Sequence, residues 1–227
     1  MHYVRIDKLK KVVAWTNKCG GSSARMQIIL DLNDPEICAM VKPIGSLGAY
    51  DVIAKYFQID PKPITIPEDY EFVWYVRDPF YRLVSCFLNR KVKMESSHQQ
   101  LRFKGFISNL FYYRQISSNV KNHTECQTEN YFQAPWQIID ITKAKFDFNP
   151  DCYPDQDEPS RRDHKYNPTN YGLGYKQGAW NLPSKQLFQN DQTYEPLSFY
   201  SKEILSKIRN FYSRDYEFLT GKIDLVE

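Results

Sequence analysis

The pattern of apolar and polar residues changes in the same way at two places in the chain. Residues 11–16 and 71–76 form short apolar runs rich in β-branched and aromatic side chains, which predicts two buried strands. Each run is followed, after a few polar or glycine residues, by a segment of helical composition, over residues 22–32 and from Pro79 onward. Strands that alternate with helices in this way predict an α/β fold, in which helices connect the strands of a parallel sheet.

The loop between the first strand and its helix has the composition of an anion-binding turn. It consists of Lys18, Cys19, Gly20, Gly21, Ser22 and Ser23. Backbone N–H groups at a helix N-terminus converge on one point, where the helix macrodipole favours negative charge. The glycines allow close approach of the backbone, the serines offer hydroxyls, and Lys18 adds a positive charge. The loop therefore predicts a phosphate-binding site, although an ordinary connector can have the same composition.

This loop differs from two well-known nucleotide-binding loops. The P-loop of nucleotide hydrolases has a lysine and then a serine or threonine after its glycines, whereas Lys18 precedes the glycines here. The Gly-x-Gly-x-x-Gly pattern of dinucleotide-binding proteins is also missing from the sequence. A nucleotide kinase-like enzyme stays an alternative, but its P-loop would have to diverge from the usual pattern.

The second strand leads into a helix with a clear start signal. Asp78 stands at the N-cap position and Pro79 at the first helical position. The apolar stripe of this helix consists of Phe80, Leu83, Val84, Phe87 and Leu88. Arg77 directly follows the strand, and Ser85, outside the stripe, lies about two helical turns after Asp78. Arg77 can therefore bind a phosphate that Ser85 also contacts; otherwise we expect Arg77 to pair with a carboxylate and Ser85 to face solvent.

Together the two motifs resemble those of the PAPS-dependent sulfotransferases. Residues 18–23 resemble the 5′-phosphosulfate loop of that family, and residues 77–85 resemble its 3′-phosphate segment, with Arg77 and Ser85 eight residues apart. The likeness is closest to the carbohydrate sulfotransferase branch that includes the Golgi chondroitin enzymes and bacterial relatives. Residues 211–219 resemble the Tyr-x-x-Asp-x-x-x-Phe end of that branch. The resemblance covers roughly the first 90 and the last 25 residues.

The resemblance implies a fold and a reaction. The fold is a P-loop-NTPase-like three-layer sandwich, in which helices flank a central parallel sheet. The reaction is the transfer of a sulfuryl group from 3′-phosphoadenosine 5′-phosphosulfate (PAPS) to an acceptor hydroxyl on a carbohydrate or small hydroxylated metabolite. The desulfonated nucleotide PAP is the product, and no metal is implied. A non-catalytic protein that binds PAPS or a glycan is the alternative from another class.

The family roles transfer to matching positions. Lys18 would stabilise the charge on the oxygen that bridges phosphate and sulfate as the bond breaks. The backbone from Cys19 to Ser23 would hold the 5′-phosphate, together with the hydroxyls of Ser22 and Ser23. Arg77 and Ser85 would hold the 3′-phosphate.

The transfer also needs a base that accepts the proton of the acceptor hydroxyl. His123 is the first choice, because it lies in an irregular segment and an imidazole with a pKa of about 6.5 suits this task near neutral pH. Glu125 and Glu129 are rivals, because some family members use glutamate. Candidates upstream of Arg77 are His2, Glu36, Asp51, Glu68 and Asp69. The remaining histidines are His98 and His164, in polar loops where we expect them to be solvated.

The rest of the chain predicts further elements. Residues 119–181 are irregular and rich in Asn, Asp, Pro and Tyr, except for an expected strand at residues 136–141. Long segments of this kind often form binding loops, so we expect the acceptor to bind there. Helices are expected at residues 49–57, at 103–116 with an aromatic core-facing side, and at 198–219. Residues 1–10 are expected as a polar lead-in.

Length and composition limit the partners and the compartment. With 227 residues and 42% apolar content, one domain over residues 1–227 is expected. A net charge of +3 is too small to indicate nucleic-acid binding, and no run is long enough for a membrane span. The first strand begins near Lys11, which leaves no room for a signal peptide. The sequence does not indicate an oligomeric state.

The cysteines point to a reducing compartment. They are five in number and widely spaced, which predicts neither a disulfide framework nor a zinc site. Because the sequence begins with Met1, we expect a cytoplasmic microbial or viral protein. The Golgi lumen is expected only if the chain is cut from a longer protein.

Overall fold

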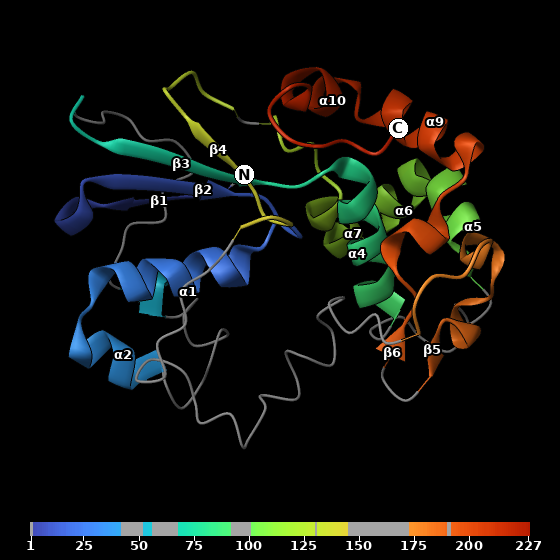
Figure 1. Cartoon of the computed structure of the whole chain (residues 1–227), viewed down its shortest axis with the longest axis horizontal. Helices are drawn as coiled ribbons and strands as arrows, with labels where there is room; N and C mark the ends of the chain where they lie inside the picture. The colour runs from blue at the N-terminus through green and yellow to red at the C-terminus, as the bar shows by residue number, and fades with distance from the viewer. Residues whose placement is uncertain are drawn as a thin grey trace. The chain divides into compact units, whose positions relative to one another are not determined.

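The computed structural model describes residues 2–41, 52–55, 68–91, 101–129, 131–144, 173–189 and 192–227. It divides into two compact units (Figure 1), each made of two separate stretches of chain. The first unit comprises Met1–Arg77 and Gln127–Arg161, and the second comprises Asp78–Cys126 and Arg162–Glu227. The expectation of a single domain over residues 1–227 stays a prediction.

The described strands of the first unit form a four-stranded mixed sheet of order β1-β2-β3-β4. Its strands are β1 (His2–Ile6), β2 (Lys11–Trp15), β3 (Glu71–Val76) and β4 (Gln137–Asp140). Strands β2, β3 and β4 run parallel, whereas β1 is antiparallel to β2. Trp15 is opposite Tyr75 in the register of β2 and β3. The carboxyl ends of these two strands therefore meet at the same edge of the sheet, where the glycine loop and Arg77 follow.

The prediction for the start of the chain was wrong. The expected polar lead-in over residues 1–10 is instead β1 and a short 3-10 helix, η1 (Asp7–Leu9). Val4 and Ile6 are fully buried, while the intervening Arg5 is only partly covered. This alternation is the signature of a strand, but it is short and charged residues interrupt and follow it. Strands β2, β3 and β4 were predicted to within one residue at each end.

The α/β class is confirmed, but the sheet is mixed because β1 adds an antiparallel edge to the parallel strands. One face of the sheet packs against α1 (Gly21–Leu32), which lies along it in Figure 1. The opposite face carries Phe72 and Trp74, which contact an aromatic cluster of Tyr131, Phe132 and Trp136. Among the described residues of this unit, an aromatic segment rather than a helix thus covers that face. The three-layer P-loop-like sandwich stays a prediction.

Helix α1 ends where the sequence predicts it. Asn33 takes a left-handed conformation with a φ of 45°, and its N–H donates to the carbonyl of Leu30 at 3.0 Å. A further helix, α2 (Pro35–Val41), follows at once, because the Asp34 carboxylate accepts from the N–H groups of Glu36 and Ile37. Most of the helix expected at residues 49–57 lies outside the described residues, although residues 52–55 are helical.

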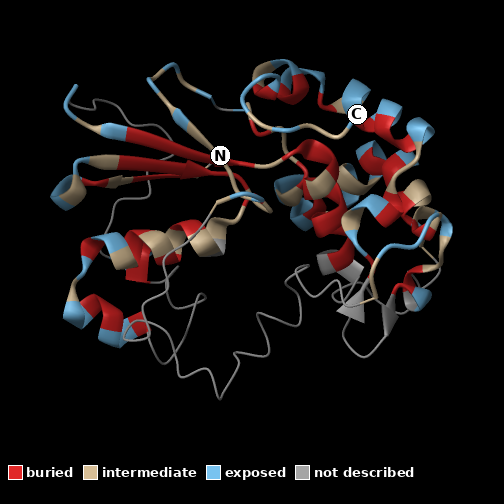
Figure 2. Cartoon of the chain, in the orientation of Figure 1, coloured by how far each residue is buried: buried red, intermediate tan, exposed pale blue. Residues whose placement is uncertain are grey.

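The described part of the second unit is mainly helical and has a core of its own (Figure 2). Its helices are α4 (Pro79–Lys91), α5 (Phe103–Ser108), α6 (Leu110–Ile116), α7 (Ser118–His123), α9 (Lys202–Phe211) and α10 (Ser213–Leu219). Short elements complete it: η3 (Ala179–Asn181), η4 (Ser184–Gln186), β5 (Phe188–Gln189), β6 (Gln192–Thr193) and η5 (Pro196–Phe199). The predicted apolar stripe of α4 is buried throughout, so the sequence identified the core-facing side of this helix correctly.

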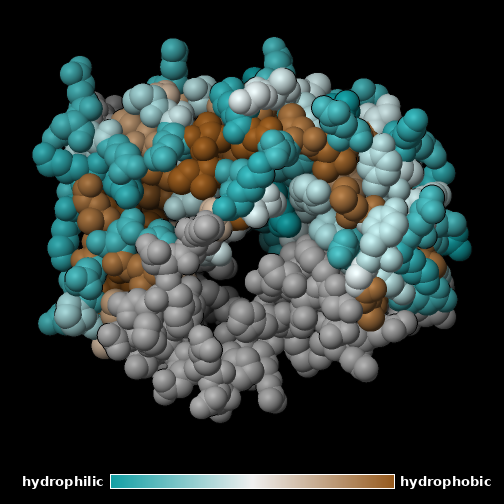
Figure 3. Space-filling view, in the orientation of Figure 1, coloured by the Kyte–Doolittle hydropathy of each residue, from teal (hydrophilic) through white to brown (hydrophobic). Residues whose placement is uncertain are grey.

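Three predictions for the second unit need correction. The two long helices expected at 103–116 and 198–219 are each divided, at Asn109 and at Tyr212. The segment expected to be irregular begins with helix α7, because Ser117 accepts the N–H of Val120 as an N-cap. Phe111 was expected in the core, but its exposed fraction is 69%. On the face shown in Figure 3, hydrophobic and hydrophilic residues are interspersed.

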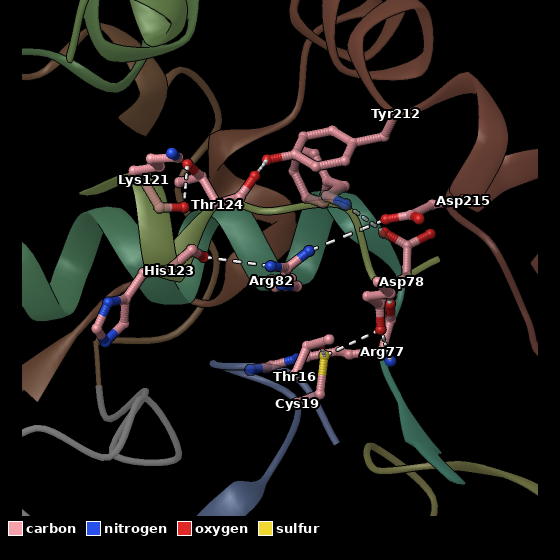
Figure 4. A network of polar contacts seen from close by, with 12 residues as sticks. Thr16, Cys19, Arg77, Asp78, Arg82, Lys121, His123, Thr124, Tyr212 and Asp215 are labelled. Carbon is pink, nitrogen blue, oxygen red and sulfur yellow. Dashed lines mark hydrogen bonds and ion pairs between the residues drawn. The ribbon is translucent and has the colours of Figure 1, made fainter. Parts of the chain in front are cut away.

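Buried charges fix the start of α4 inside the second unit (Figure 4). The Asp78 carboxylate accepts the N–H of Phe80 at 2.6 Å, as predicted for an N-cap, and that of Val226 at 2.8 Å. Arg82 and Asp215 are almost fully buried, and their charged groups lie 3.9 Å apart. This separation exceeds hydrogen-bond length, so their attraction is electrostatic.

Tyr212 adds a neutral contact to this buried region. Its hydroxyl donates to the carbonyl of Thr124 at 2.6 Å, and burial raises the pKa of Tyr212 far above its ordinary value. The phenol therefore stays protonated and serves as a hydrogen-bond donor that ties α10 to the end of α7.

The cysteines only partly agree with the expectation. Cys38 is disulfide-bonded, whereas the sequence predicted no disulfide framework. Cys19, Cys86 and Cys126 are thiols that take no part in a disulfide. The expected cytoplasmic location stays a prediction. Within the described parts of the chain, no helix has the length and apolar character needed to cross a membrane.

We predict that Asp215→Asn lowers the free energy of unfolding by about 3–5 kcal/mol, because it removes a buried negative charge that lies 3.9 Å from the buried Arg82 guanidinium. Urea unfolding followed by circular dichroism would measure the change. Glu203→Gln is the matched control in the same unit, since it breaks the exposed Lys104–Glu203 pair at 2.7 Å, where solvent screens both charges. Equal losses of unfolding free energy in the two variants would show that the buried Arg82–Asp215 pair stabilises the protein no more than an exposed pair does.

Candidate anion-binding site

The glycine loop of the first unit forms a tight turn between β2 and α1. The N–H of Cys19 donates to the carbonyl of Thr16 at 3.1 Å. Lys18 and Gly20 take left-handed conformations, with φ of 67° and 70°. Such a conformation is unusual for a lysine and costs roughly 1–2 kcal/mol, so the surrounding contacts must hold it in place.

The loop presents an uncapped helix N-terminus. The carbonyl of Gly20 accepts the first helical hydrogen bond, from the N–H of Ala24 at 2.8 Å. The N–H groups of Gly21, Ser22 and Ser23 precede that bond, and Gly20 has no side chain that could cap them. Such a group of donors, reinforced by the helix macrodipole, can bind an anion. The predicted arrangement of strand, loop and helix is confirmed.

Both glycines are also required by packing. A Cβ atom on Gly20 would lie 2.1 Å from Cγ1 of Ile141, which follows β4. A Cβ atom on Gly21 would lie 2.7 Å from Cδ1 of Trp15 at the end of β2. No side chain fits at either position without a shift of its neighbours. The glycines thus hold the loop against the carboxyl ends of two strands.

Arg77 stands beside this loop. Its Nη1 donates to the carbonyl of Lys18 at 3.5 Å, a long hydrogen bond. Its Nε is buried and has no hydrogen-bond partner among the described residues. No described carboxylate pairs with Arg77, so the ion pair expected in the absence of a ligand is not found there. A guanidinium with unused donors next to a helix N-terminus is suited to bind an anion.

A buried glutamine, Gln127, holds the backbone of Arg77. Its Oε1 accepts the N–H of Arg77 at 2.9 Å, and its Nε2 donates to the carbonyl of Arg77 at 2.7 Å. The same Oε1 also accepts from the Cys19 thiol at 2.9 Å. Sequence reasoning missed this residue, because a single glutamine in a polar segment gives no local signal.

Ser85 and His123, which the resemblance assigns to the site, belong to the second unit. Ser85 is buried in α4, so the expectation that it faces solvent without a ligand was wrong. His123 is the last residue of α7, not part of an irregular loop, and its Nδ1 lies 2.8 Å from the carbonyl oxygen of Asn119. Their roles in binding and catalysis stay predictions.

The other candidate bases lie in varied surroundings. Glu125 is half-buried and Glu129 is exposed. Asp69 is exposed and pairs with Lys10 at 2.6 Å. Two further candidates are exposed: Glu36 and Glu68. The remaining predicted positions lie outside the described residues: Asp51, His98, His164 and the side chain of Ser22.

His2 is the histidine of the first unit, and the structure places it near the glycine loop. It is opposite Trp15 in the register of β1 and β2, and the two rings stack with centroids 6.0 Å apart. Burial lowers the pKa of His2 below 6.5, so the ring is neutral at pH 7. A neutral imidazole can accept a proton, so His2 stays a candidate base, although its lowered pKa makes it less basic than an exposed histidine. Among the described residues, no cluster of three or more His, Cys, Asp or Glu side chains could hold a metal ion.

We predict that Gly20→Ala destabilises the first unit through left-handed strain and through its clash with Ile141. The clash contributes about 1–3 kcal/mol, as for other overpacked sites. A double-mutant cycle with Ile141→Ala separates the two effects, because removing the Ile141 side chain leaves only the strain. Urea unfolding of the four proteins should show a smaller loss for Gly20→Ala in the Ile141→Ala background. The same loss in both backgrounds would contradict the close approach.

We also predict that protonation of His2 destabilises the first unit. Because its pKa is lower in the folded chain than the unfolded value of 6.5, the unfolded state binds more protons between the two values. Stability should therefore decline as the pH falls from about 6.5 through the folded pKa, and His2 should add no further change below that. Thermal unfolding from pH 4 to 8 should show a steeper decline for wild type than for His2→Gln. Identical profiles would exclude a lowered pKa.

A scan against protein-family models, a search of curated proteins and a search of solved structures found no match to this chain. The resemblance to the sulfotransferases therefore rests on the sequence motifs alone.

Proposed function

We propose that this protein is a PAPS-dependent sulfotransferase that acts on a hydroxyl of a carbohydrate or small hydroxylated metabolite. The observation that carries the proposal is the pairing, within the first unit, of an uncapped α1 N-terminus with the adjacent Arg77 guanidinium. Each of the two motifs thus contributes one group of anion-binding donors at the same edge of the sheet: the first N–H groups of α1 and the guanidinium of Arg77. A donor with phosphates at both the 3′ and 5′ positions needs two such groups.

In the proposed reaction, the acceptor oxygen attacks the sulfur atom of PAPS. A new oxygen–sulfur bond forms as the bond between sulfur and the bridging oxygen breaks, and PAP leaves with the electron pair. Lys18 stabilises the charge that develops on that oxygen, and the N–H groups at the start of α1 bind the 5′-phosphate. Arg77 binds the 3′-phosphate. Positioning and electrostatics account for most of the catalysis, by analogy with phosphoryl transfer.

The acceptor proton must pass to a base. His123, Glu125 and Glu129 stay candidates, and so does His2, which is neutral and is opposite Trp15 at the end of the strand that leads into the glycine loop. The proposal includes a P-loop-NTPase-like fold, supported by the parallel strands β2, β3 and β4 and by the loop between β2 and α1.

The first test is binding and turnover by the wild-type protein. Titration calorimetry with PAP, and PAP release from PAPS in the presence of glycans and hydroxylated small molecules, should both give positive results. Absence of PAP binding would refute the proposal. Binding of PAP without transfer to any acceptor would favour the non-catalytic alternative, and magnesium-dependent binding of ATP instead of PAP would favour the kinase-like one.

We predict that Lys18→Ala lowers kcat by about 10²–10³-fold, the usual effect of losing a group that stabilises transition-state charge. Lys10→Ala is the matched control, since Lys10 is also a left-handed lysine, with a φ of 49°, but pairs with Asp69 away from the loop. It removes the same charge and should leave kcat unchanged. Equal effects of both variants would remove the assignment of Lys18.

Arg77→Ala should instead act mainly on binding. Because it removes a charged hydrogen-bond donor to one phosphate, the Kd for PAP should rise about 10- to 100-fold. The Kd for 5′-AMP, which lacks the 3′-phosphate, should change little. Equal weakening of both nucleotides would show that Arg77 does not recognise the 3′-phosphate.

A further inference from the structure

Gln127 connects two segments that are far apart in sequence. One side-chain oxygen accepts from Cys19, which is 108 residues away, and from Arg77, which is 50 residues away. The side-chain nitrogen of Gln127 donates a hydrogen bond to the carbonyl of Arg77. Cys19 directly follows Lys18, so a single side-chain amide joins the glycine loop to Arg77, the residue that follows β3.

The bonds to Arg77 have the pattern of a sheet. A neighbouring strand would satisfy the N–H and the carbonyl of a residue in this way, but β3 ends at Val76. The Gln127 amide therefore continues the pairing by one residue beyond the strand. It fixes the backbone of Arg77, while the guanidinium makes one long bond, to the carbonyl of Lys18, within the described part of the chain.

The bridge needs the chemistry of a glutamine. Gln127 is fully buried, and its amide supplies both an acceptor for two donors and a donor for the Arg77 carbonyl. Glutamate would lose the donor and add a charge, and methionine would fill the space without hydrogen bonds. The Cys19 thiol, also fully buried and 3.0 Å from the hydroxyl of Thr16, completes the connection to the end of β2.

We propose that Gln127 is a positioning residue that sets the separation between the α1 N-terminus and Arg77, so that one donor nucleotide can occupy both phosphate-binding groups at once. This inference rests on the proposed function. Two binding groups at a fixed separation reinforce each other, and the advantage is lost when the geometry prevents simultaneous contact. Gln127 touches neither phosphate in this account and acts only through the backbone of the loop and of Arg77.

The test compares PAP, which carries both phosphates, with 5′-AMP, which carries one. In wild type, the ratio of the 5′-AMP Kd to the PAP Kd measures how much the second phosphate contributes. We expect Gln127→Met to reduce this ratio by about tenfold or more, because the PAP Kd rises while the 5′-AMP Kd changes little. Cys19→Ala removes the thiol that donates to Gln127 but leaves both bonds to Arg77, so it should reduce the ratio by less.

The ratio separates positioning from simple destabilisation. A variant that is only partly folded weakens both nucleotides by the same factor, so their ratio stays constant. Gln133→Met is the matched control, since Gln133 is exposed and lies in the same segment. It should leave the ratio at the wild-type value. Gln127→Glu, which keeps the size of the side chain, provides the same measurement if Gln127→Met does not fold.

The outcomes distinguish this inference from the proposed function. If wild type binds PAP and the ratio is the same in wild type and in either Gln127 variant, the positioning role is overturned and the proposed function stands. If wild type does not bind PAP, both are overturned. A reduced ratio in a folded Gln127 variant, with an unchanged ratio in Gln133→Met, supports the inference.

Discussion

The parallel pairing of β2 with β3 is the constraint on which the candidate site depends. Parallel strands end at the same edge of a sheet, and the register that puts Trp15 opposite Tyr75 brings the glycine loop and Arg77 to that edge. Both strands are almost entirely buried, so a shift by one residue would move each side chain to the opposite face, where the packing is shaped for its neighbour. The packing of the sheet therefore brings the two anion-binding groups to the same edge.

The loop satisfies packing and binding with the same residues. Gly20 and Gly21 are needed because Ile141 and Trp15 occupy the space that side chains would fill. The absence of a side chain at Gly20 also leaves the first N–H groups of α1 uncapped. Packing and anion binding are compatible reasons for these glycines. The close approach of the loop to the ends of β2 and β4 holds the uncapped N-terminus of α1 in a fixed place.

Much of this arrangement could be predicted, because its signals are local. Asp78 and Pro79 predict the start of a helix. The glycine loop is recognisable because it lies between an apolar run and a segment of helical composition. The features that were missed depend on distant segments. Gln127 gains its role from partners 50 and 108 residues away, which no local pattern encodes. Strand β1 was missed because charged residues interrupt its short alternation of apolar and polar positions. Its pairing with β2, which identifies it as a strand, involves residues that no local pattern indicates.

The backbone at the end of β3 is held more firmly than the side chain that would bind the ligand. Gln127 fixes the backbone of Arg77 in the first unit, and the Asp78 carboxylate is held by the N–H groups of Phe80 and Val226 in the second. The Arg77 guanidinium, by contrast, makes one long hydrogen bond and keeps a buried Nε without a partner among the described residues. A buried donor of this kind is costly unless something else satisfies it. A second anionic group, bound by Arg77 beside the one at the start of α1, would do so, which is why we interpret the arrangement as a binding site.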